Sequence, residues 1–354
     1  MQFRAAAAIP AHKSRTTRRW IIRVVSLSLL ALLITLGTCW GVLALYYFAP
    51  LGVAARITLA GLFAILGLVA AILVYVPGSR AYPLAMFAVA LGVLIVCWSN
   101  ITPSNDRAWK PGVAVLAGAS IDGNRVTIHN IRNFDYRSES DFDIAYYART
   151  FDLDQLDSVD LIASYWAGPA IAHVILSFGF GTGSPVAISI ERRDELNEDY
   201  STIKGLFKQY ELFYVVADER DVVRLRTNIR RDPPERVYLY RLRGNRDDAR
   251  RLFLAYVREI NSLQRYPRFY NTLTTNCTTS IWLNARVNPG HVPFSWKVLL
   301  SGYLPEYLYE HGRLDTSVPF AELQRRSLIN SPAMAADRTS DFSRRIRAGP
   351  PVTR

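Results

Sequence analysis

One cysteine and one histidine of this sequence are placed to act as a nucleophile and its base. Cys277 stands in the segment 274–279, where a polar loop is followed by a helical pattern. Backbone N–H groups and the helix dipole at such a position favour a thiolate, so we expect the pKa of Cys277 to be lowered. His173 lies in an apolar, β-rich segment about a hundred residues earlier. Together these residues indicate a thiol enzyme.

Each residue also has a structural interpretation, because free cysteine is among the most buried residue types and a histidine in an apolar strand is often a core residue. Cys39 and Cys97 fall in long apolar runs, where we expect them to act as small apolar side chains. Cys277 then has no disulfide partner. An unpaired thiol in an oxidising compartment favours a catalytic role for Cys277.

Two residues of a predicted hairpin are candidates for orienting the histidine. The alternation of a strand puts Ser177 on the same face as His173, while Ser189 and Glu191 share a face of the next strand. A hydroxyl or carboxylate there would fix the tautomer of His173 and stabilise its protonated form. We favour Glu191 for this role, with Ser189 second. Alternatively, Glu191 is a solvent-exposed residue at the polar end of its strand, without a role in the site.

Other motifs argue against several chemistries. Gly179, Gly181 and Gly183 join two predicted strands without the helix and lysine of a phosphate loop, so we expect a hairpin turn. The Gly-x-Ser-x-Gly elbow of serine hydrolases is absent. The histidines after the apolar part show no metal-ligand spacing, so we expect neither a metal nor another cofactor. These histidines are His129, His173, His291 and His311.

The elements that position these residues come after an apolar N-terminal part. The first hundred residues contain no Asp or Glu, and the first carboxylate is that of Asp106. Eight of the 42 Lys and Arg residues lie there, so 34 basic and 30 acidic residues leave the rest of the chain at only +4 of the total +12. No nucleic-acid recognition motif accompanies this charge, and we expect no nucleic-acid partner.

Three apolar runs predict a membrane anchor. They cover 24–49, 57–76 and 82–98, each close to the roughly 20 residues that cross a bilayer. A cleaved signal peptide is the alternative for the first run, which is longer than a usual signal-peptide core. Lysines and arginines before the first run place the N-terminus in the cytoplasm, and an odd number of spans then exports the rest of the chain.

This topology divides the chain into four parts. We expect a basic cytoplasmic segment at 1–23, three transmembrane helices at 24–99 and a periplasmic catalytic domain at 100–330. The tail, 331–354, is small, polar and basic, so we expect it to be disordered. The protein would then be a multi-pass protein of a bacterial inner membrane.

Sequence patterns predict an α+β exported domain with a mainly antiparallel sheet and a helix that starts at Cys277. Strands are predicted at 125–131, 173–180, 185–190, 212–216 and 237–242. Helices are predicted at 247–265, 277–286 and 296–311. The segment from Phe294 to Tyr309 is rich in aromatic residues and leucine. It is either a core helix or a surface that meets lipid.

Five ordered segments resemble one family. They are AHVILSFGF around His173, VAISIERRDE at 186–195, LFKQYELFYVVADERD at 206–221, YNTLTTNCTTS at 270–280 and SGYLPEYLYEHGRLD at 301–315. Together they resemble the uncharacterised periplasmic domain that includes the Lnb lipoprotein N-acyltransferases of Gram-negative bacteria. The resemblance covers about residues 120–315.

This resemblance implies an activity on lipids. The family's activity is transfer of a fatty acyl chain from a phospholipid to the free α-amino group of a lipoprotein cysteine, which implies a phospholipid donor and a lipoprotein acceptor as partners. The nucleophile falls on Cys277 and the base on His173, while the third role falls on the region of Glu191. The three-span N-terminus departs from the family pattern and leaves room for another acyl acceptor.

The order of the two residues resembles a second group. A histidine on a strand before a cysteine that starts a helix reverses the order of NlpC-type peptidases and is similar to the permuted lecithin:retinol acyltransferase relatives. Those relatives carry an Asn-Cys pair, as Asn276 and Cys277 form here, and move acyl chains through a thioester. This resemblance implies a papain-like, permuted NlpC-like fold and adds Asn276 to the site.

We therefore predict a ping-pong acyl transfer through a thioester on Cys277, with backbone N–H groups at the start of the helix holding the oxyanion. Two alternatives stay open. A thiol peptidase or amidase of the envelope would use the same pair with water as the acceptor. A non-catalytic envelope protein would keep its role when Cys277 is replaced.

Overall fold

The chain divides into two compact units between Thr102 and Pro103 in the computed structural model, which describes residues 11–47, 51–199 and 201–348. Each of the four predicted parts of the chain includes residues outside the described ones. These are residues 1–10 of the N-terminus, 48–50 of the transmembrane part, 200 of the catalytic domain and 349–354 of the tail.

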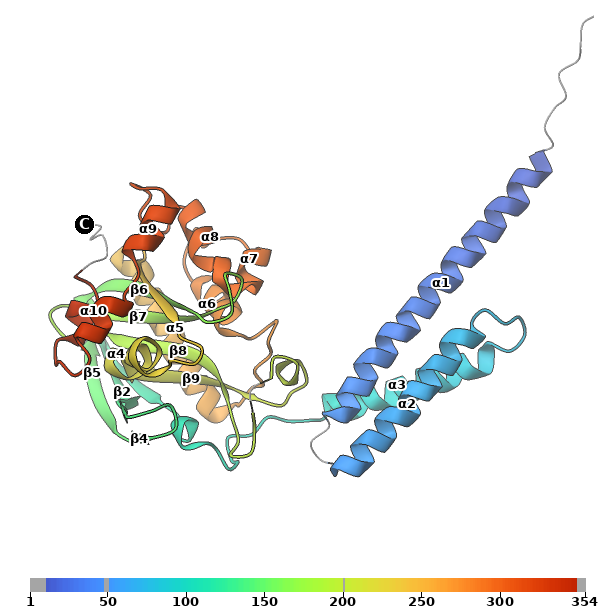
Figure 1. Cartoon of the computed structure of the whole chain (residues 1–354), viewed down its shortest axis with the longest axis horizontal. Helices are drawn as coiled ribbons and strands as arrows, with labels where there is room; N and C mark the ends of the chain where they lie inside the picture. Colours follow the sequence, from blue (N-terminus) through green and yellow to red (C-terminus); the bar gives the residue numbers. More distant parts are fainter. Residues whose placement is uncertain (1–10, 48–50, 200, 349–354) are drawn as a thin grey trace, which may run out of the picture. The chain divides into compact units, whose positions relative to one another are not determined.

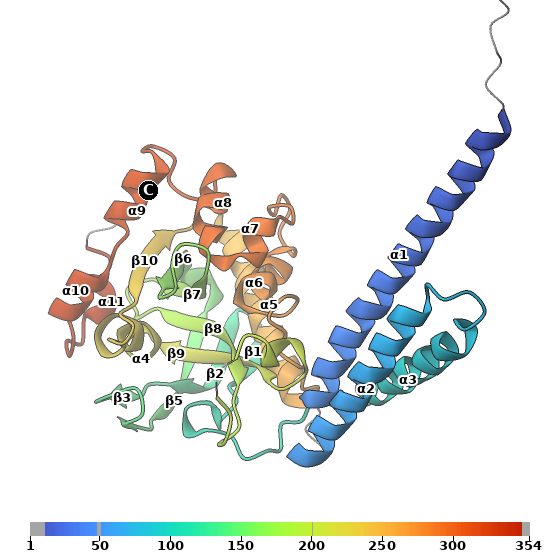
Figure 2. The ribbon, with the colours of Figure 1, turned by 45° about the vertical axis from the view of Figure 1, so that its right-hand side comes forward.

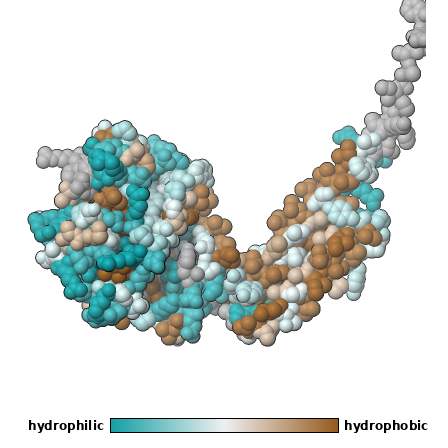
Figure 3. Space-filling view, in the orientation of Figure 1, coloured by the Kyte–Doolittle hydropathy of each residue, from teal (hydrophilic) through white to brown (hydrophobic). Residues whose placement is uncertain are grey.

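The first unit consists of three helices: α1 (Ala11–Tyr46), α2 (Val53–Leu73) and α3 (Ala81–Ser99). Each is long and apolar enough to cross a membrane, so the three predicted apolar segments are three separate helices. Figure 3 shows that hydrophobic residues, in brown, cover most of this unit. Where α1 and α2 meet, a Cβ atom at Gly67 would lie 2.0 Å from Thr38 Oγ1, so glycine permits their close approach.

The second unit is built on an eight-stranded sheet. Its strands are β1 (Gly118–Asp122), β2 (Arg125–Arg132), β5 (Tyr146–Asp152), β6 (Leu156–Tyr165), β7 (Ala172–Phe180), β8 (Val186–Arg193), β9 (Glu211–Asp218) and β10 (Arg236–Arg241). Their order is β1-β2-β9-β8-β7-β6-β10, and β5 pairs with β2. Every pairing is antiparallel except that of β2 with β9. A separate hairpin joins β3 (Asp135–Tyr136) and β4 (Phe142–Asp143).

Helices cover both faces of this sheet (Figures 1 and 2). One face packs against α5 (Arg246–Arg265), α6 (Cys277–Ala285), α7 (Trp296–Leu299), α8 (Leu304–Glu310) and α9 (Phe320–Arg326). The other packs against α4 (Glu219–Arg224), the π-helix η4 (Leu225–Ile229), α10 (Asn330–Ala335) and α11 (Phe342–Arg345). Central strand β7 supplies both cores, since Val174 and Leu176 face α5 and α6 while Ile175 faces the second core. Burial on both faces explains its continuous apolar sequence.

The α+β class, the mainly antiparallel sheet and all five predicted strands are confirmed. The predicted helix at 296–311 is wrong as a single helix, because it is broken into α7, the short turn η5 (Ser301–Tyr303) and α8. A Cβ atom at Gly302 would lie 2.0 Å from the carbonyl oxygen of Pro169. This close backbone approach fixes the break, and Pro305 lacks the N–H that a continuous helix would need.

The prediction that the tail is disordered is wrong for residues 331–348. This segment contains α10 and α11, and Phe342 and Ile346 are completely buried against the sheet. Arg347 forms ion pairs with Asp160 of β6 and Glu219 of α4. The composition of the tail is polar, but a few well-spaced apolar residues and one buried arginine are enough to hold it against the second core.

Replacing Phe342 by alanine should therefore destabilise the exported domain by about 3–5 kcal/mol, the usual cost of removing a buried phenylalanine ring. Thermal unfolding of the full-length protein in detergent measures this change. Met334→Ala is the matched control, because Met334 is exposed on the same segment and should cost less than about 0.5 kcal/mol. Equal small effects would mean that the tail does not pack on the sheet.

Candidate active site

Cys277 is the first residue of α6, and Asn276 holds it there as the N-cap. The Asn276 side chain accepts a hydrogen bond from Thr279 N at 2.9 Å, and Thr279 Oγ1 accepts one from Asn276 N at 2.9 Å. This reciprocal capping box satisfies two backbone donors at the start of the helix. Asn276, which was added to the site by resemblance, therefore positions the thiol in the structure.

Asn276→Ala should destabilise the domain by about 1 kcal/mol, because the helix loses its side-chain cap. Chemical unfolding followed by circular dichroism would measure the difference. Asn276→Ser keeps a side-chain oxygen at the cap and should restore most of the loss. If the serine variant were as unstable as the alanine variant, capping would not be the contribution of Asn276.

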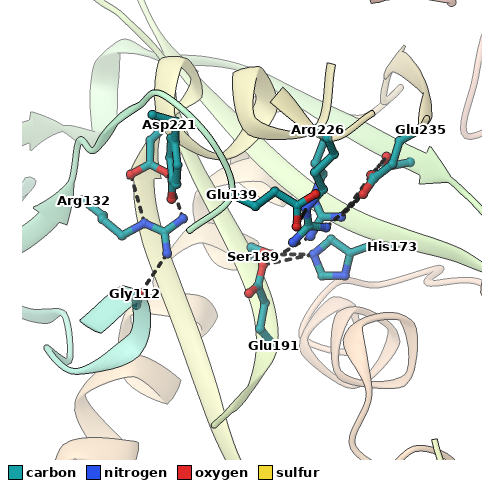
Figure 4. A network of polar contacts seen from close by, with 12 residues as sticks. Gly112, Arg132, Glu139, His173, Ser189, Glu191, Asp221, Arg226 and Glu235 are labelled. Carbon is teal, nitrogen blue, oxygen red and sulfur yellow. Dashed lines mark hydrogen bonds and ion pairs between the residues drawn. The ribbon is translucent and has the colours of Figure 1, made fainter. Parts of the chain in front are cut away.

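The register between β7 and β8 brings three candidate residues together (Figure 4). Ile175 pairs with Ser189, so His173 and Glu191 lie just beyond this pair. His173 Nε2 lies 2.6 Å from Ser189 Oγ and 3.3 Å from Glu191 Oε1. Ser189 Oγ in turn donates to Glu191 Oε1 at 2.7 Å. Both Glu191 and Ser189 therefore contact the histidine as expected, as successive members of one hydrogen-bonded chain.

The hydrogen bonds among His173, Ser189 and Glu191 determine which nitrogen of His173 can act as a base. Since the Ser189 hydroxyl gives its proton to Glu191, its oxygen is left to accept a proton from His173 Nε2. Nε2 then carries the hydrogen and Nδ1 carries the lone pair. Nδ1 makes no hydrogen bond to any residue that the structure describes. The arrangement thus leaves Nδ1 available to accept a proton.

The thiol lies against the backbone next to His173. The backbone N–H of Val174, the residue after His173 in the chain, interacts with the Cys277 thiol, just beyond the last β7–β8 pair. Within the described ranges no hydrogen bond joins the side chains of Cys277 and His173. Such contacts are often long in unliganded enzymes and shorten when substrate binds.

Burial raises the pKa of Cys277 above its ordinary value, so the expectation of a lowered pKa is wrong. The residue is only 8% exposed, and the loss of hydration outweighs the opposing effect of the N–H groups of Val174 and Thr278. Burial also lowers the pKa of His173, assisted by the nearby charge of Arg226, while Glu191 opposes this shift. At neutral pH the pair is therefore a neutral thiol and a neutral imidazole.

Arg226 and Glu235 extend the chain of polar contacts beyond the predicted residues. Arg226, on η4, lies 3.6 Å from Glu191 and 3.2 Å from Glu235, and both Arg226 and Glu235 are buried. Burial tends to raise the pKa of Glu235, but Arg226 and Arg230 prevail and lower it to about 2. Sequence reasoning missed Arg226 because its local pattern does not differ from that of the neighbouring arginines. Only tertiary burial distinguishes it.

The start of α6 also offers backbone N–H donors. Thr279 N and Ser280 N are bonded to Asn276 Oδ1 and O, respectively. The N–H of Cys277 has no hydrogen-bond acceptor within the part of the chain that the structure describes, and the N–H of Thr278 interacts with the Cys277 thiol itself. Both N–H groups are at the position of the thiol, where they can stabilise an oxyanion that forms there.

Cys277 and His173 belong to no metal-binding cluster of the described residues, and the cavity beside α5 lies elsewhere. No group of three His, Cys, Asp or Glu side chains within the described residues could hold a metal ion. A cavity of about 480 Å³ lies between the start of α5 and the segment after α6, and neither Cys277 nor His173 lines it. Cys277 is buried at the start of α6, and His173 lies near the start of β7.

Comparison with known proteins supports the resemblance to the Lnb family. Residues 143–302 match the family model described as the Lnb N-terminal periplasmic domain, and this range includes both His173 and Cys277. No curated protein and no solved structure matches the chain, so the papain-like or permuted NlpC-like fold stays a prediction. The match and the three apolar helices together support an inner-membrane protein whose C-terminal domain is periplasmic.

Proposed function

We propose that this protein is a membrane-bound acyltransferase that uses Cys277 as its nucleophile. The proposal is carried by the hydrogen-bonded chain from His173 through Ser189 to Glu191, together with the contact between the Cys277 thiol and the backbone N–H of Val174, the residue after His173. This arrangement contains a nucleophile, a base and groups that orient the base. The match to an Lnb periplasmic domain favours a phospholipid as donor and a lipoprotein amine as acceptor.

In the first half of the proposed reaction, His173 Nδ1 accepts the thiol proton as the sulfur of Cys277 forms a bond to the ester carbonyl carbon. The carbonyl oxygen becomes an oxyanion, which the N–H groups of Cys277 and Thr278 stabilise. The intermediate then expels the lysophospholipid alkoxide, which takes the proton from His173. The ester bond is broken, and an acyl thioester remains on Cys277.

In the second half, the free α-amino group of the acceptor attacks the thioester carbonyl. His173 accepts a proton from the nitrogen, the carbon–sulfur bond breaks, and the thiolate of Cys277 recovers the proton. The products are an amide and the free thiol. Ser189 and Glu191 stabilise the imidazolium that exists in both halves. With water in place of the amine the same steps would hydrolyse the acyl chain.

Intact-mass spectrometry of the detergent-solubilised protein tests this proposal. After incubation with phospholipid alone, we expect a mass increase of one fatty acyl chain, which hydroxylamine removes. Adding a diacylated lipopeptide with a free N-terminus should then discharge the adduct and yield an N-acylated peptide. Release of free fatty acid without peptide acylation would instead favour hydrolysis. Absence of an adduct, with a thiol that still reacts with iodoacetamide, would favour a peptidase or amidase.

The rate of adduct formation should fall as pH drops through a value below 6.5, because the pKa of His173 lies below its usual 6.5 and only the neutral imidazole accepts a proton. Arg226→Met removes a cation that lowers this pKa. In this variant the fall in rate at low pH, the acid limb of the pH–rate profile, should therefore move to higher pH. Glu191→Gln removes a carboxylate that raises the pKa, so its limb should move to lower pH.

Rate measurements between about pH 4 and pH 8 would show these two shifts. Arg236→Met provides a control for the loss of a positive charge, because Arg236 is exposed at the start of β10. Its acid limb should coincide with that of the wild type. Movement of the limb in the same direction for Arg226→Met and Glu191→Gln would contradict His173 as the titrating base.

A further inference from the structure

Five exposed apolar side chains border the candidate active site. They are 36% to 56% exposed and comprise Ile171, Phe294, Trp296, Leu299 and Leu300. We call them the apolar rim. Four of them lie on or next to α7, which packs beside α6 in both views of the ribbon (Figures 1 and 2). A group of large apolar residues of this kind on a protein surface marks an interaction site.

The segment that carries the rim also contacts both sides of the candidate site. The hydroxyl of Thr278, the residue after Cys277, donates to the carbonyl oxygen of Val298 at 2.7 Å. The backbone N–H of the residue before His173 donates to Ser301 Oγ at 2.9 Å. The rim is therefore held in place by the same short stretch of chain that holds the neighbours of the nucleophile and the base. A surface that contacts the rim lies at the site.

The aromatic members of the rim are held in position by packing. The ring of Trp296 meets Tyr303 edge-on at 5.4 Å, and that of Phe294 meets Trp282 edge-on at 5.2 Å. Rings held in this way remain exposed on the domain surface, since neither can turn into the core without losing its neighbour. A partly buried tryptophan with an apolar body is typical of residues at the boundary between lipid and water.

The charges next to the rim are neutralised. Lys297 lies within the α7 segment and forms ion pairs with Glu306 at 3.4 Å and Glu310 at 2.6 Å. The side chain of Arg286 lies over the ring of Trp282 at 5.4 Å. Because Lys297 and Arg286 together balance the two carboxylates, repulsion from anionic lipid headgroups is small. The charge pattern therefore fits a phospholipid surface.

The chain itself places a membrane within reach of this domain. Ser99 is the last residue of α3, and Ser104, a few residues later, donates its N–H to Glu211 Oε1 of the exported domain at 3.2 Å. So short a segment spans at most about 18 Å. We propose that the apolar rim docks into the surface of the phospholipid bilayer and presents lipid esters to Cys277. This inference deepens the proposed function, on which the purpose of the docking rests.

Depth-dependent quenching of a label at the rim would test the docking in the full-length protein. Leu299→Cys is introduced with Cys39→Ala, Cys97→Ala and Cys277→Ala, labelled with an environment-sensitive fluorophore and reconstituted in phospholipid nanodiscs. Half of the samples contain lipids with a nitroxide on the acyl chain. Ile144→Cys in the same background is the control, because Ile144 is also apolar and is more exposed than Leu299, at 55% against 36%, but comes directly after β4, away from α7 (Figure 1).

We expect nitroxide lipids to quench the Leu299→Cys label at least threefold more strongly than the Ile144→Cys label. Equal quenching at the two positions would overturn the docking. Since this background has no Cys277 thiol, the result does not depend on catalysis. A failure of docking and a failure of the proposed acyl transfer are therefore distinguished.

A second measurement separates docking from the integrity of the site. The double variant Trp296→Ser with Leu300→Ser should form the acyl adduct from vesicle phospholipid at least tenfold more slowly than the wild type. Alkylation of Cys277 by soluble iodoacetamide should change by less than twofold. An unchanged rate of acylation, or an equal fall in acylation and alkylation, would overturn the role of the rim in lipid presentation.

Discussion

Cys277→Ala is expected to lower acyl transfer by roughly 10⁴-fold or more, the scale seen when an enzyme loses its only nucleophile. No other side chain near His173 can form a thioester, and the remaining backbone donors can only stabilise charge. The measurement is the rate of peptide N-acylation together with the mass of the protein after incubation with phospholipid. The acyl adduct should be absent from the variant.

Two comparisons make this result specific. The double variant Cys39→Ala with Cys97→Ala removes the thiols of the apolar helices and should keep full activity. Thermal unfolding of Cys277→Ala should change little, because the substitution removes one sulfur atom from a site that is already capped by Asn276. Acylation above a tenth of the wild-type rate in Cys277→Ala would contradict a covalent mechanism at this residue.

His173→Ala is expected to slow adduct formation by about 10²- to 10⁴-fold, the usual contribution of a general base. The effect should be large because burial raises the pKa of the thiol, so the thiolate is scarce at neutral pH without a base. Alkylation of the thiol at varied pH gives an independent readout. In the variant the reaction should depend only on the raised pKa of Cys277 and become fast only at alkaline pH.

His129→Ala is a suitable control, because His129 is exposed on β2 and belongs to the same domain. Its rate of adduct formation should equal that of the wild type. If His173→Ala formed the adduct within threefold of the wild-type rate, the base would have to be another group. The hydrogen-bonded chain to Glu191 would then serve only the stability of the second core.

The match to the Lnb domain model and the geometry of the pair are independent arguments. The match concerns residues 143–302 as a whole, whereas the geometry concerns the contacts of a few side chains. Both arguments concern the same part of the chain, which contains His173 and Cys277. Acyl transfer, its donor and its acceptor are the parts of the proposal that mass spectrometry and the variant rates test.

Structural features that depend on residues close together in the sequence could be predicted from it. The spans follow from continuous apolar runs, and the amphipathic helix α5 follows from its apolar spacing. Alternation along the strand predicted that Ser189 and Glu191 share a face, whereas the register that brings them to His173 was shown only by the structure. The helix start at Cys277 was visible because the capping residues are neighbours in sequence.

Features that depend on distant parts of the chain were decided by the tertiary structure. The raised pKa of Cys277 arises from its burial by other elements of the domain. Arg226 influences the site because the position of η4 places its side chain next to Glu191. The break near Gly302 depends on the backbone of Pro169, and the order of the tail depends on a pocket for Phe342. Burial and close approach are properties of pairs of segments, so no local pattern contains them.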